Sequence, residues 1–382
     1  MRISVLLALS ATLLSPSAAG SLRVATFNTS LYSERSGGLI ERLHGDDAAA
    51  RKIAATIQRQ RPDILLLNEF DYDAGGAAAD LFQQRYLGVP QHGQPGITYR
   101  YRYFAPVNTG VPSGFDLDGD GRHDGPGDAW GFGRHPGQYG MLVLSRFPID
   151  ASQVRTFRNF RWQDMPDARA PQKPDGSPWY PPQAWALFPL SSKSHWDVPI
   201  RTPLGTVHLL AAHPTPPVFD GPEDRNGRRN ADEIRFWREY VSAQAADWIV
   251  DDGGRRGGLA ADARFVIAGD LNADPADGDG HRDAILELLE HPRVLRMATP
   301  ESAGADAAAR AAGGANVGHR GAHRHDTADF GPRAGNLRVD YVLPSVGFRA
   351  VAAGVFWPMP GETGHDWLDA SDHRMVWIDL AD

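Results

Sequence analysis

Polar side chains follow several short apolar segments, at the points where each segment is expected to end as a β-strand. These side chains are Asn28, Asn68, Glu69, His213, Asp270 and Asn272. In layered α/β proteins, ligands bind in the crevice at the carboxyl ends of the strands. Carboxylate and amide oxygens suit Mg²⁺, Ca²⁺ or Mn²⁺, whereas a zinc site would more often use several His or Cys. The pattern therefore predicts one site for a hard divalent cation beside an imidazole.

A second group of residues with chemical potential lies near the C-terminus. Asp340 stands in the segment Arg338–Tyr341, and His373 directly follows Ser371 and Asp372. A carboxylate next to an imidazole fixes its tautomer and raises its basicity, as a general base requires. Taken singly, an Asp at a strand end is more often a turn former, and a His is more often a satisfied polar residue. The prediction of a catalytic site therefore rests on the whole set.

The elements that must position these residues alternate between strands and helices. Short apolar runs rich in β-branched residues predict buried strands. These runs are Leu22–Phe27, Ile64–Leu67, Met141–Leu144, Thr206–Ala211, Arg264–Ala268, Val339–Leu343 and Met375–Leu380. Helices are predicted over Asp47–Gln60 with Asp46 as the N-cap, over Asn230–Val250, and over Arg282–Leu289. The alternation indicates a layered α/β fold.

Four long polar connections interrupt this pattern. They cover residues 88–138, 157–199, 215–229 and 299–336. Loops of this length inside a domain are usually functional or mobile. We therefore predict one catalytic domain over residues 20–382, with these segments as insertions.

Seven short motifs, in order, resemble the endonuclease/exonuclease/phosphatase superfamily. They are Thr26–Asn28, Leu67–Glu69, Tyr139–Arg146, Ala212–His213, Gly269–Asn272, Val339–Tyr341 and Ser371–His373. This superfamily includes deoxyribonuclease I, exonuclease III, bacterial sphingomyelinases and inositol polyphosphate 5-phosphatases. The resemblance spans the chain from about Leu22 to Leu380. It implies a four-layer α/β/β/α sandwich of two mainly antiparallel sheets, with long loop insertions.

The resemblance also implies a metal site and a general base. Glu69, with Asn28 near it, would hold a divalent cation, Mg²⁺ or Mn²⁺. Asp372 would lie next to this cation. His373, oriented by Asp340, would activate the attacking water for in-line attack on phosphorus.

The remaining roles implied by the resemblance concern the phosphate and the leaving group. Asp270 and Asn272 would position water and phosphate, and His213 would stabilise or protonate the leaving side. Tyr139, together with Asn272, is the expected substrate contact. The sequence departs from the pattern at Met141, where deoxyribonuclease I has a glutamate that supports its acid histidine. His213 therefore either lacks such a partner or takes one from an insertion.

Composition and charge limit the class of protein. The 382 residues carry 47 acidic and 39 basic side chains, a net charge of −8, so the chain has no general electrostatic attraction for nucleic acid. The absence of cysteine excludes disulfides. Residues 1–19 combine a basic start, an apolar run over Ile3–Leu14 and small residues, the layout of a secretory signal peptide. We expect a periplasmic or extracellular monomer with no transmembrane segment and no stable protein partner.

An acidic segment resembles the opening of a calcium loop. Asp116, Asp118 and Asp120 occupy its first, third and fifth positions, and a glycine occupies the sixth. The twelfth position, which should carry a bidentate carboxylate, is Gly127, and Asp128 follows one residue late. The two interpretations are a Ca²⁺ site in the Asp116–Asp128 loop and a solvated polar turn.

The functional prediction is an exported, divalent-cation-dependent phosphoesterase. Hydrolysis of a phosphodiester, as in a nuclease, is the leading interpretation. The alternatives among enzymes are a phosphomonoesterase for sugar or inositol phosphates and a sphingomyelinase-like phosphodiesterase for phospholipid head groups. A calcium-stiffened binding module with a relic site is the alternative from another class.

Overall fold

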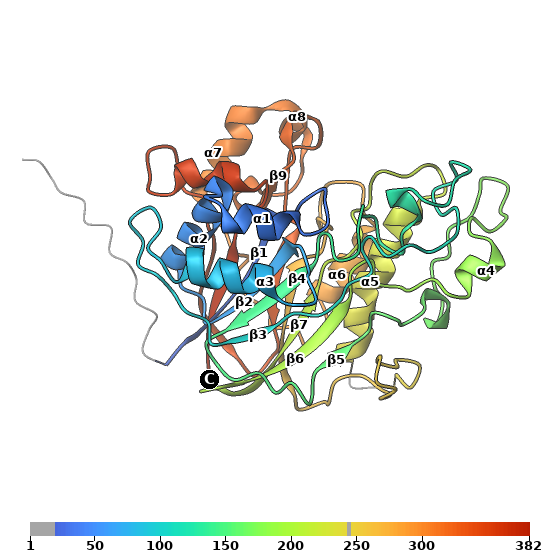
Figure 1. Ribbon diagram of the computed structural model, residues 1–382, viewed down its shortest axis with the longest axis horizontal. Helices are drawn as coiled ribbons and strands as arrows, with labels where there is room; N and C mark the ends of the chain where they lie inside the picture. Colours follow the sequence, from blue (N-terminus) through green and yellow to red (C-terminus); the bar gives the residue numbers. More distant parts are fainter. Residues whose placement is uncertain (1–19, 243–245) are drawn as a thin grey trace, which may run out of the picture.

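Two β-sheets form the centre of the computed structural model, which describes residues 20–242 and 246–382 (Figure 1). The predicted signal peptide over residues 1–19 lies outside the described residues. Helices cover the outer face of each sheet, so the chain has the predicted four layers. No helix among the described residues is long and apolar enough to cross a membrane.

The first sheet has six strands. They are β1 (Leu22–Leu31), β2 (Ile64–Phe70), β3 (Tyr101–Tyr103), β4 (Met141–Ser145), β12 (Arg349–Val355) and β13 (Val376–Ala381). Their order across the sheet is β12-β13-β1-β2-β4-β3, and every pair is antiparallel except β1–β2.

The second sheet has five strands. They are β5 (Arg155–Thr156), β6 (His195–Thr202), β7 (Gly205–Ala212), β8 (Arg264–Asp270) and β11 (Asp340–Pro344). Their order is β11-β8-β7-β6-β5, and only β7–β8 is parallel. Two short strands, β9 (Ala328–Asp329) and β10 (Asn336–Leu337), form a separate pair. Both main sheets are therefore mainly antiparallel, as predicted.

The helices divide between the two outer faces. The structure contains α1 (Gly38–His44), α2 (Ala48–Gln60), α3 (Ala77–Leu81), α4 (Pro182–Trp185), α5 (Arg225–Val241), α6 (Arg282–Leu289), α7 (Ala303–Ala312) and α8 (Gly331–Ala334). Helices α1 to α3 lie against the first sheet, whereas α5 and α6 lie against the second (Figure 1).

Three buried apolar clusters fill the spaces between the four layers. Alternate residues of each central strand face opposite sides of the sheet. In β2, Ile64 and Leu66 pack between the two sheets, while Leu65 and Leu67 pack against the helices of the first sheet. Both faces of these strands are buried, which explains why they read as continuous apolar runs rather than as alternating ones.

The predicted strands are present, most of them one to four residues longer than expected, and two long strands were missed. Strand β6 begins inside the connection predicted over residues 157–199 and carries buried polar residues, among them Asp197, which accepts a hydrogen bond from Tyr240. Strand β12 is rich in alanine and half exposed, so it has no apolar run to mark it. Neither strand therefore has the pattern on which the predictions depend.

Two helix boundaries also differ from the prediction. The N-cap of α2 is Asp47 rather than Asp46, because the Asp47 carboxylate accepts the amide of Ala50 at 2.8 Å. Helix α5 begins at Arg225 and ends at Val241, instead of covering Asn230–Val250. Its end follows from Ser242, whose hydroxyl donates to the Arg238 carbonyl at 2.8 Å and whose backbone is extended.

Candidate active site

The ends of strands from both sheets meet at the predicted site. Asn28 lies opposite Asn68 in the parallel β1–β2 ladder, and Asp340 lies opposite Asp270 in the β11–β8 ladder. The amide of Asn68 joins the two sheets, because its oxygen accepts the backbone amide of Asp270 and its nitrogen donates to the carbonyl of Ala212. Asn68 therefore fixes the distance between the sheets where the site is built.

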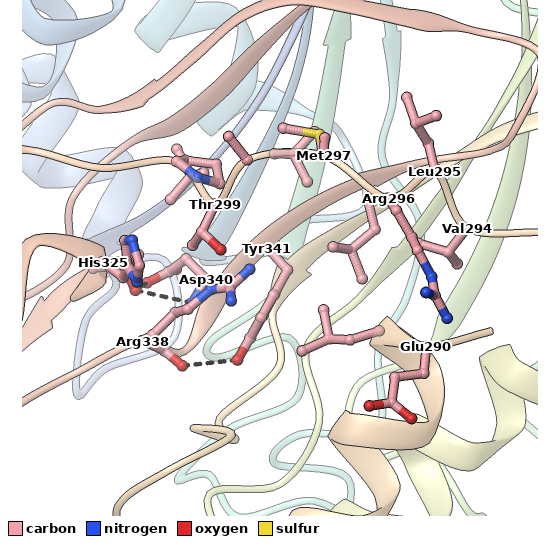
Figure 2. A pocket seen from close by; sticks show the side chains of 17 residues that line it. Glu290, Val294, Leu295, Arg296, Met297, Thr299, His325, Arg338, Asp340 and Tyr341 are labelled. Atoms are coloured by element: carbon pink, nitrogen blue, oxygen red, sulfur yellow. Dashed lines mark hydrogen bonds between the residues drawn. The ribbon is translucent and has the colours of Figure 1, made fainter. Parts of the chain in front are cut away.

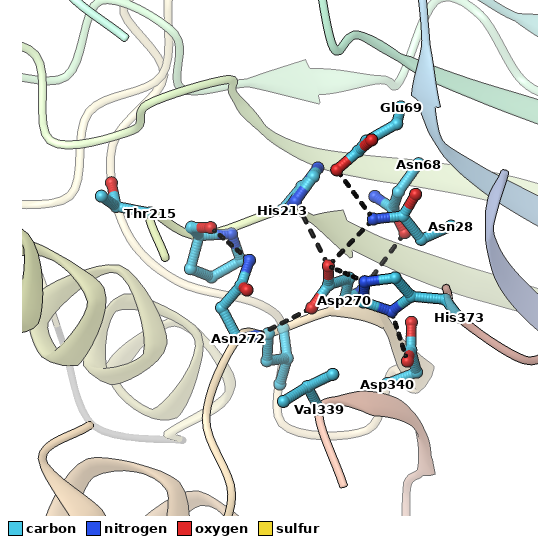
Figure 3. A network of polar contacts seen from close by, with 12 residues as sticks. Asn28, Asn68, Glu69, His213, Thr215, Asp270, Asn272, Val339, Asp340 and His373 are labelled. Carbon is cyan, nitrogen blue, oxygen red and sulfur yellow. Dashed lines mark hydrogen bonds and ion pairs between the residues drawn. The ribbon is translucent and has the colours of Figure 1, made fainter. Parts of the chain in front are cut away.

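Asp270 is the centre of the polar network shown in Figure 3. Its Oδ2 accepts Asn28 Nδ2 at 3.0 Å and lies 3.4 Å from His213 Nε2 and 3.6 Å from His373 Nε2. Its Oδ1 accepts the backbone amide of Asn272 at 2.9 Å. Four of the predicted site residues thus converge on one buried carboxylate.

His373 and Asp340 form the predicted pair. His373 Nδ1 lies 2.9 Å from Asp340 Oδ2, and both side chains are almost fully buried. Thr327, which the sequence did not indicate, donates its hydroxyl to the same Asp340 oxygen at 2.8 Å. The hydroxyl of Ser371 accepts the His373 amide. These contacts hold the His373 ring with its second nitrogen, Nε2, on the side of Asp270.

The charges around this pair favour a protonated, strongly basic imidazole. Desolvation alone would lower the pKa of His373, but Asp340 and Asp270 outweigh it and raise the pKa. Burial raises the pKa of Asp340 against the opposing effect of His373. Burial would also raise the pKa of Asp270, yet the charge of His373 and the hydrogen bond from His213 hold it well below its usual range. Asp270 therefore stays ionised, and together with Asp340 it stabilises the imidazolium that His373 forms when it accepts a proton.

The carboxylate of Glu69 is suited to binding a cation. Desolvation raises the pKa of Glu69 to about 7; the charges of Asp372 and Asp270 act in the same direction, against the hydrogen bond from Asn28 and the charge of His373. Its Oε1 accepts one hydrogen bond, from Asn28 Nδ2 at 3.0 Å. Crowded carboxylates are stable as anions when a counter-charge joins them, and an oxygen-rich donor set fits Mg²⁺ or Mn²⁺. The residues present therefore fit a divalent cation.

A compact acidic group lies next to this carboxylate. Asp270, Asp340 and His373 offer ligand atoms within 4.8 Å of one another. Asp340 and His373, however, are hydrogen-bonded to each other. Asp270 is therefore the member of this group that could bind a cation together with Glu69.

His213 lacks the partner that a catalytic acid histidine would need. Its Nδ1 is buried and has no hydrogen-bond partner among the described residues. Desolvation, followed by the positive charge of Lys193, lowers the pKa of His213 to about 4, even though Asp270 opposes the shift. Within residues 20–242 and 246–382, no insertion replaces the glutamate that is absent at Met141. The imidazole of His213 is therefore neutral near pH 7 and can donate a hydrogen bond from Nε2.

Six of the predicted residues line one cavity of about 770 Å³. They are Glu69, His213, Asp270, Asn272, Asp372 and His373. Asn28 and Asp340 lie behind this wall and are buried, whereas Asp372 is exposed. Tyr139 is not part of the wall, and its ring packs on Tyr32 with the ring centroids 4.6 Å apart. Its role as a substrate contact stays a prediction.

Backbone strain accompanies the site. Glu69, Tyr139 and Asn272 have φ angles of 54°, 55° and 51°, in the left-handed region that non-glycine residues seldom adopt. Such conformations persist where the surrounding structure fixes them, and they gather at functional sites. Here the fixing contacts are visible, since the Asn272 amide is held by Asp270 and the Tyr139 amide by Asp71.

A second cavity, of about 340 Å³, also has Asp340 in its wall (Figure 2). Asp340 and Thr327 form part of its wall, together with Thr299, His325 and Arg338. Neither Glu69 nor His373 reaches it. The first cavity is therefore the candidate active site.

The predicted calcium loop brings its carboxylates together. Ligand atoms within 4.8 Å of one another come from Asp116, Asp118 and Asp120. Asp128 is buried and accepts the amides of Leu117 and Gly125, so it closes the loop from within. Calcium binding to this loop stays a prediction.

Calcium titration tests this loop. We expect Asp118→Ala to weaken the binding of Ca²⁺ by about 10-fold or more, because one of three converging carboxylates is lost. Isothermal titration calorimetry measures the affinity, and Asp175→Ala, in an exposed turn of another insertion, serves as the matched control. Equal affinities of wild type and Asp118→Ala would remove the loop from consideration.

Comparison with known proteins identifies the family of this chain. The model of the endonuclease/exonuclease/phosphatase family matches residues 25–373. The chain belongs to this family. Family members are metal-dependent hydrolases of phosphate esters, which confirms the predicted enzyme class. A search of the curated proteins finds no match.

The chain is also similar to several solved structures. An endonuclease/exonuclease/phosphatase from Beutenbergia cavernae superposes with a TM-score of 0.52 at 19% identity, covering 95% of this chain and 72% of that one. Sphingomyelinase C from Streptomyces griseocarneus gives a TM-score of 0.44 at 18% identity, covering 95% and 99%. TDP2 from Caenorhabditis elegans gives 0.44 at 14% identity, covering 96% and 76%. At these identities the likeness concerns the fold alone.

Proposed function

We propose that the protein is an exported phosphodiesterase that acts as a monomer and depends on Mg²⁺ or Mn²⁺. The observation that carries this proposal is the opening of Glu69, His213 and the paired His373 onto one cavity. This arrangement supports a cation site, a base and a leaving-group contact around a single phosphate. A relic site would be expected to have lost part of the set.

The proposed reaction is in-line hydrolysis of a phosphate ester. In its neutral form, His373 takes a proton from water at Nε2, and Asp340 stabilises the imidazolium that results. The water oxygen forms a bond to phosphorus while the bond from phosphorus to the leaving oxygen breaks. His213 is neutral and would share its single Nε2–H between Asp270 and that leaving oxygen, which then takes its proton from solvent rather than from His213. Asn272 orients the phosphate, and its own position is fixed by Asp270.

In this proposal Glu69 would bind the cation, and Asn28 would support Glu69. Asp270 and Asp372 would lie near the cation. A bound divalent cation supplies positive charge that neutralises the phosphate oxygens as negative charge develops on them. The residues of the chain would hold the phosphate oxygens in a partly buried position, where the charge of the cation interacts strongly with them.

A phospholipid phosphodiester is the second candidate substrate, and one observation favours it. Phe219 is 87% exposed at the wall of the cavity, beside Pro217 and Val218. An exposed apolar residue next to a phosphate site suits contact with a lipid surface. Phe219 also suits stacking on a nucleobase. Assays with a lipid and with nucleic acids as substrates decide between these two interpretations.

A substrate panel tests the proposal. The mature protein is assayed with plasmid DNA, RNA, bis-p-nitrophenyl phosphate, p-nitrophenyl phosphate and sphingomyelin, each with Mg²⁺, Mn²⁺, Ca²⁺ or EDTA. We expect diester hydrolysis that EDTA abolishes. Turnover of the monoester alone would replace the diesterase with a phosphatase. Failure to hydrolyse any phosphate ester would contradict the proposed function.

A further inference from the structure

The candidate active-site cavity, of about 770 Å³, is larger than the phosphate site that the proposed reaction uses. Beyond the catalytic and metal-binding side chains, much of its wall is apolar and includes Pro217, Val218, Phe219, Phe330 and Leu337. A cavity of this size, with an apolar wall and a few polar groups at one place, is typical of a site for a small organic molecule. The apolar wall is therefore a candidate contact for the part of the substrate that is not phosphate.

Three segments far apart in the sequence join to form this wall. The loop after β7 carries His213 and then lines the cavity with Pro217. A Cβ atom added at Gly280 would lie 3.6 Å from Pro217 Cγ, and one added at Gly278 would lie 3.3 Å from Leu337 Cδ1. The strip between the two glycines thus packs against Pro217 on one side and Leu337 on the other. The result is a continuous surface that starts beside the leaving-group contact of the proposed reaction.

Phe219 is held at the mouth of the cavity by a fixed loop. Its side chain is 87% exposed, and its φ angle of 67° lies in the left-handed region that aromatic residues seldom adopt. Asn226 of α5 fixes the residues on either side, because its Nδ2 donates to the Val218 carbonyl and its amide donates to Asp220 Oδ2, both at 2.7 Å. Strain of this kind persists where contacts impose it, and it gathers at functional sites. The loop therefore presents an aromatic ring in one place, as contact with a ligand requires.

The charges of the cavity wall are unsuited to a nucleic acid. Outside the predicted metal and catalytic set, the described lining residues include four carboxylates and one guanidinium; these are Asp274, Asp277, Asp279, Asp329 and Arg333. Proteins that bind single-stranded nucleic acids combine aromatic side chains with a positively charged groove. Here the aromatic side chain is present without such a groove, so a polyanion would be repelled. A small diester carries one negative charge, which the proposed cation offsets.

We propose that the substrate is a small phosphodiester whose leaving alcohol carries an apolar group, and that this group packs on Phe219 and the adjoining apolar wall. The assignment follows from chain order, because His213, the leaving-group contact, begins the loop that presents Phe219. An aromatic ring and an acyl chain share the required chemistry, and the experiment below distinguishes them. Phe219 is then a specificity-determining residue, since it contacts the leaving group but none of the reacting atoms. This inference rests on the proposed function.

Three diesters with different leaving groups test the inference. Bis-p-nitrophenyl phosphate has an aromatic leaving group, monomeric dihexanoyl phosphatidylcholine has one that carries acyl chains, and dithymidine monophosphate has a polar nucleoside. Phe219→Asn removes the apolar side chain but keeps a residue type that tolerates a left-handed backbone. We expect it to lower kcat/KM by about 10-fold for one or both apolar diesters, because the burial of a large apolar group is lost. For dithymidine monophosphate we expect a change of less than about twofold. Phe219→Leu, which stays apolar, should keep most of the activity.

The pattern of losses decides the outcome. A loss for one apolar diester alone assigns an aromatic or an acyl group, and a loss for both assigns apolar groups in general. Phe132→Asn is the matched control, since Phe132 is 60% exposed but lies outside the cavity, and it should leave all three rates unchanged. Equal losses for the three diesters, or no loss for either apolar one, would overturn the inference. A loss confined to dithymidine monophosphate would overturn it in favour of stacking on a nucleobase.

A binding measurement separates this inference from the proposed function. The two apolar diesters are titrated calorimetrically into Mg²⁺-saturated His373→Ala protein, with and without Phe219→Asn, so that no turnover is needed. Binding that weakens with Phe219→Asn, in a protein whose wild type hydrolyses none of the diesters, would contradict only the proposed function. Absent binding of both diesters, or binding that Phe219→Asn leaves unchanged, would overturn the inference.

Discussion

Replacing His373 by alanine is expected to lower kcat/KM for the hydrolysed phosphate ester by about 1,000-fold, the usual range for loss of a general base. The reason is geometric and electrostatic. His373 Nδ1 is held at 2.9 Å by Asp340, and its Nε2 lies beside Asp270 at the cavity wall. His213 also lines this cavity beside Asp270, but burial lowers its pKa to about 4 and its Nδ1 has no partner among the described residues, so it is a much weaker base. Steady-state rates with saturating Mg²⁺ measure the loss.

The structure offers a matched control for this prediction. His208 Nδ1 lies 2.7 Å from Asp197, so it forms a similar histidine–carboxylate pair, but on β7 and away from the cavity. We expect His208→Ala to keep kcat/KM within about twofold of wild type, as surface changes outside a site usually do. Asp340→Asn should fall between the two, because the imidazole loses its stabilising charge but stays in place. Equal losses in His208→Ala and His373→Ala would contradict the assignment of the base.

Replacing Glu69 by glutamine is expected to remove most of the affinity for Mg²⁺, and with it the dependence of that affinity on pH. A proton and a cation compete for the Glu69 carboxylate, whose pKa is raised to about 7. Below pH 7 the proton occupies it, and above pH 7 it is ionised. Wild type should therefore bind Mg²⁺ about 10-fold more weakly at pH 6 than at pH 8. Calorimetric titration at the two pH values measures this difference.

Asp71 provides the control for the pH effect. Desolvation raises its pKa to about 6, so it too titrates in this range, but it accepts the amides of Ser33 and Tyr139. We expect Asp71→Asn to keep the pH dependence of Mg²⁺ binding, whereas Glu69→Gln flattens it. If the pH dependence disappears in Asp71→Asn and survives in Glu69→Gln, the cation is not held at Glu69.

Local sequence patterns determined the central strands and the identity of the reacting groups. Ile64–Leu67 and Arg264–Ala268 are buried on both faces, and such strands are marked by continuous apolar runs in the sequence. The functional residue, Glu69 or Asp270, stands two positions after the end of each run, so the strand and its functional residue are recognised together. The pairing of His373 with Asp340 followed from the family motifs, although 32 residues separate the two.

Only the tertiary structure decided the surroundings of these groups. Thr327 reaches Asp340 from a polar segment without a motif. The isolation of His213 Nδ1 is likewise invisible in the sequence, which left a partner from an insertion open. The physical reason is that burial, desolvation and contacts between distant segments depend on how the layers pack. A strand's own pattern encodes the face that it buries, but not the charge that another segment brings to its end.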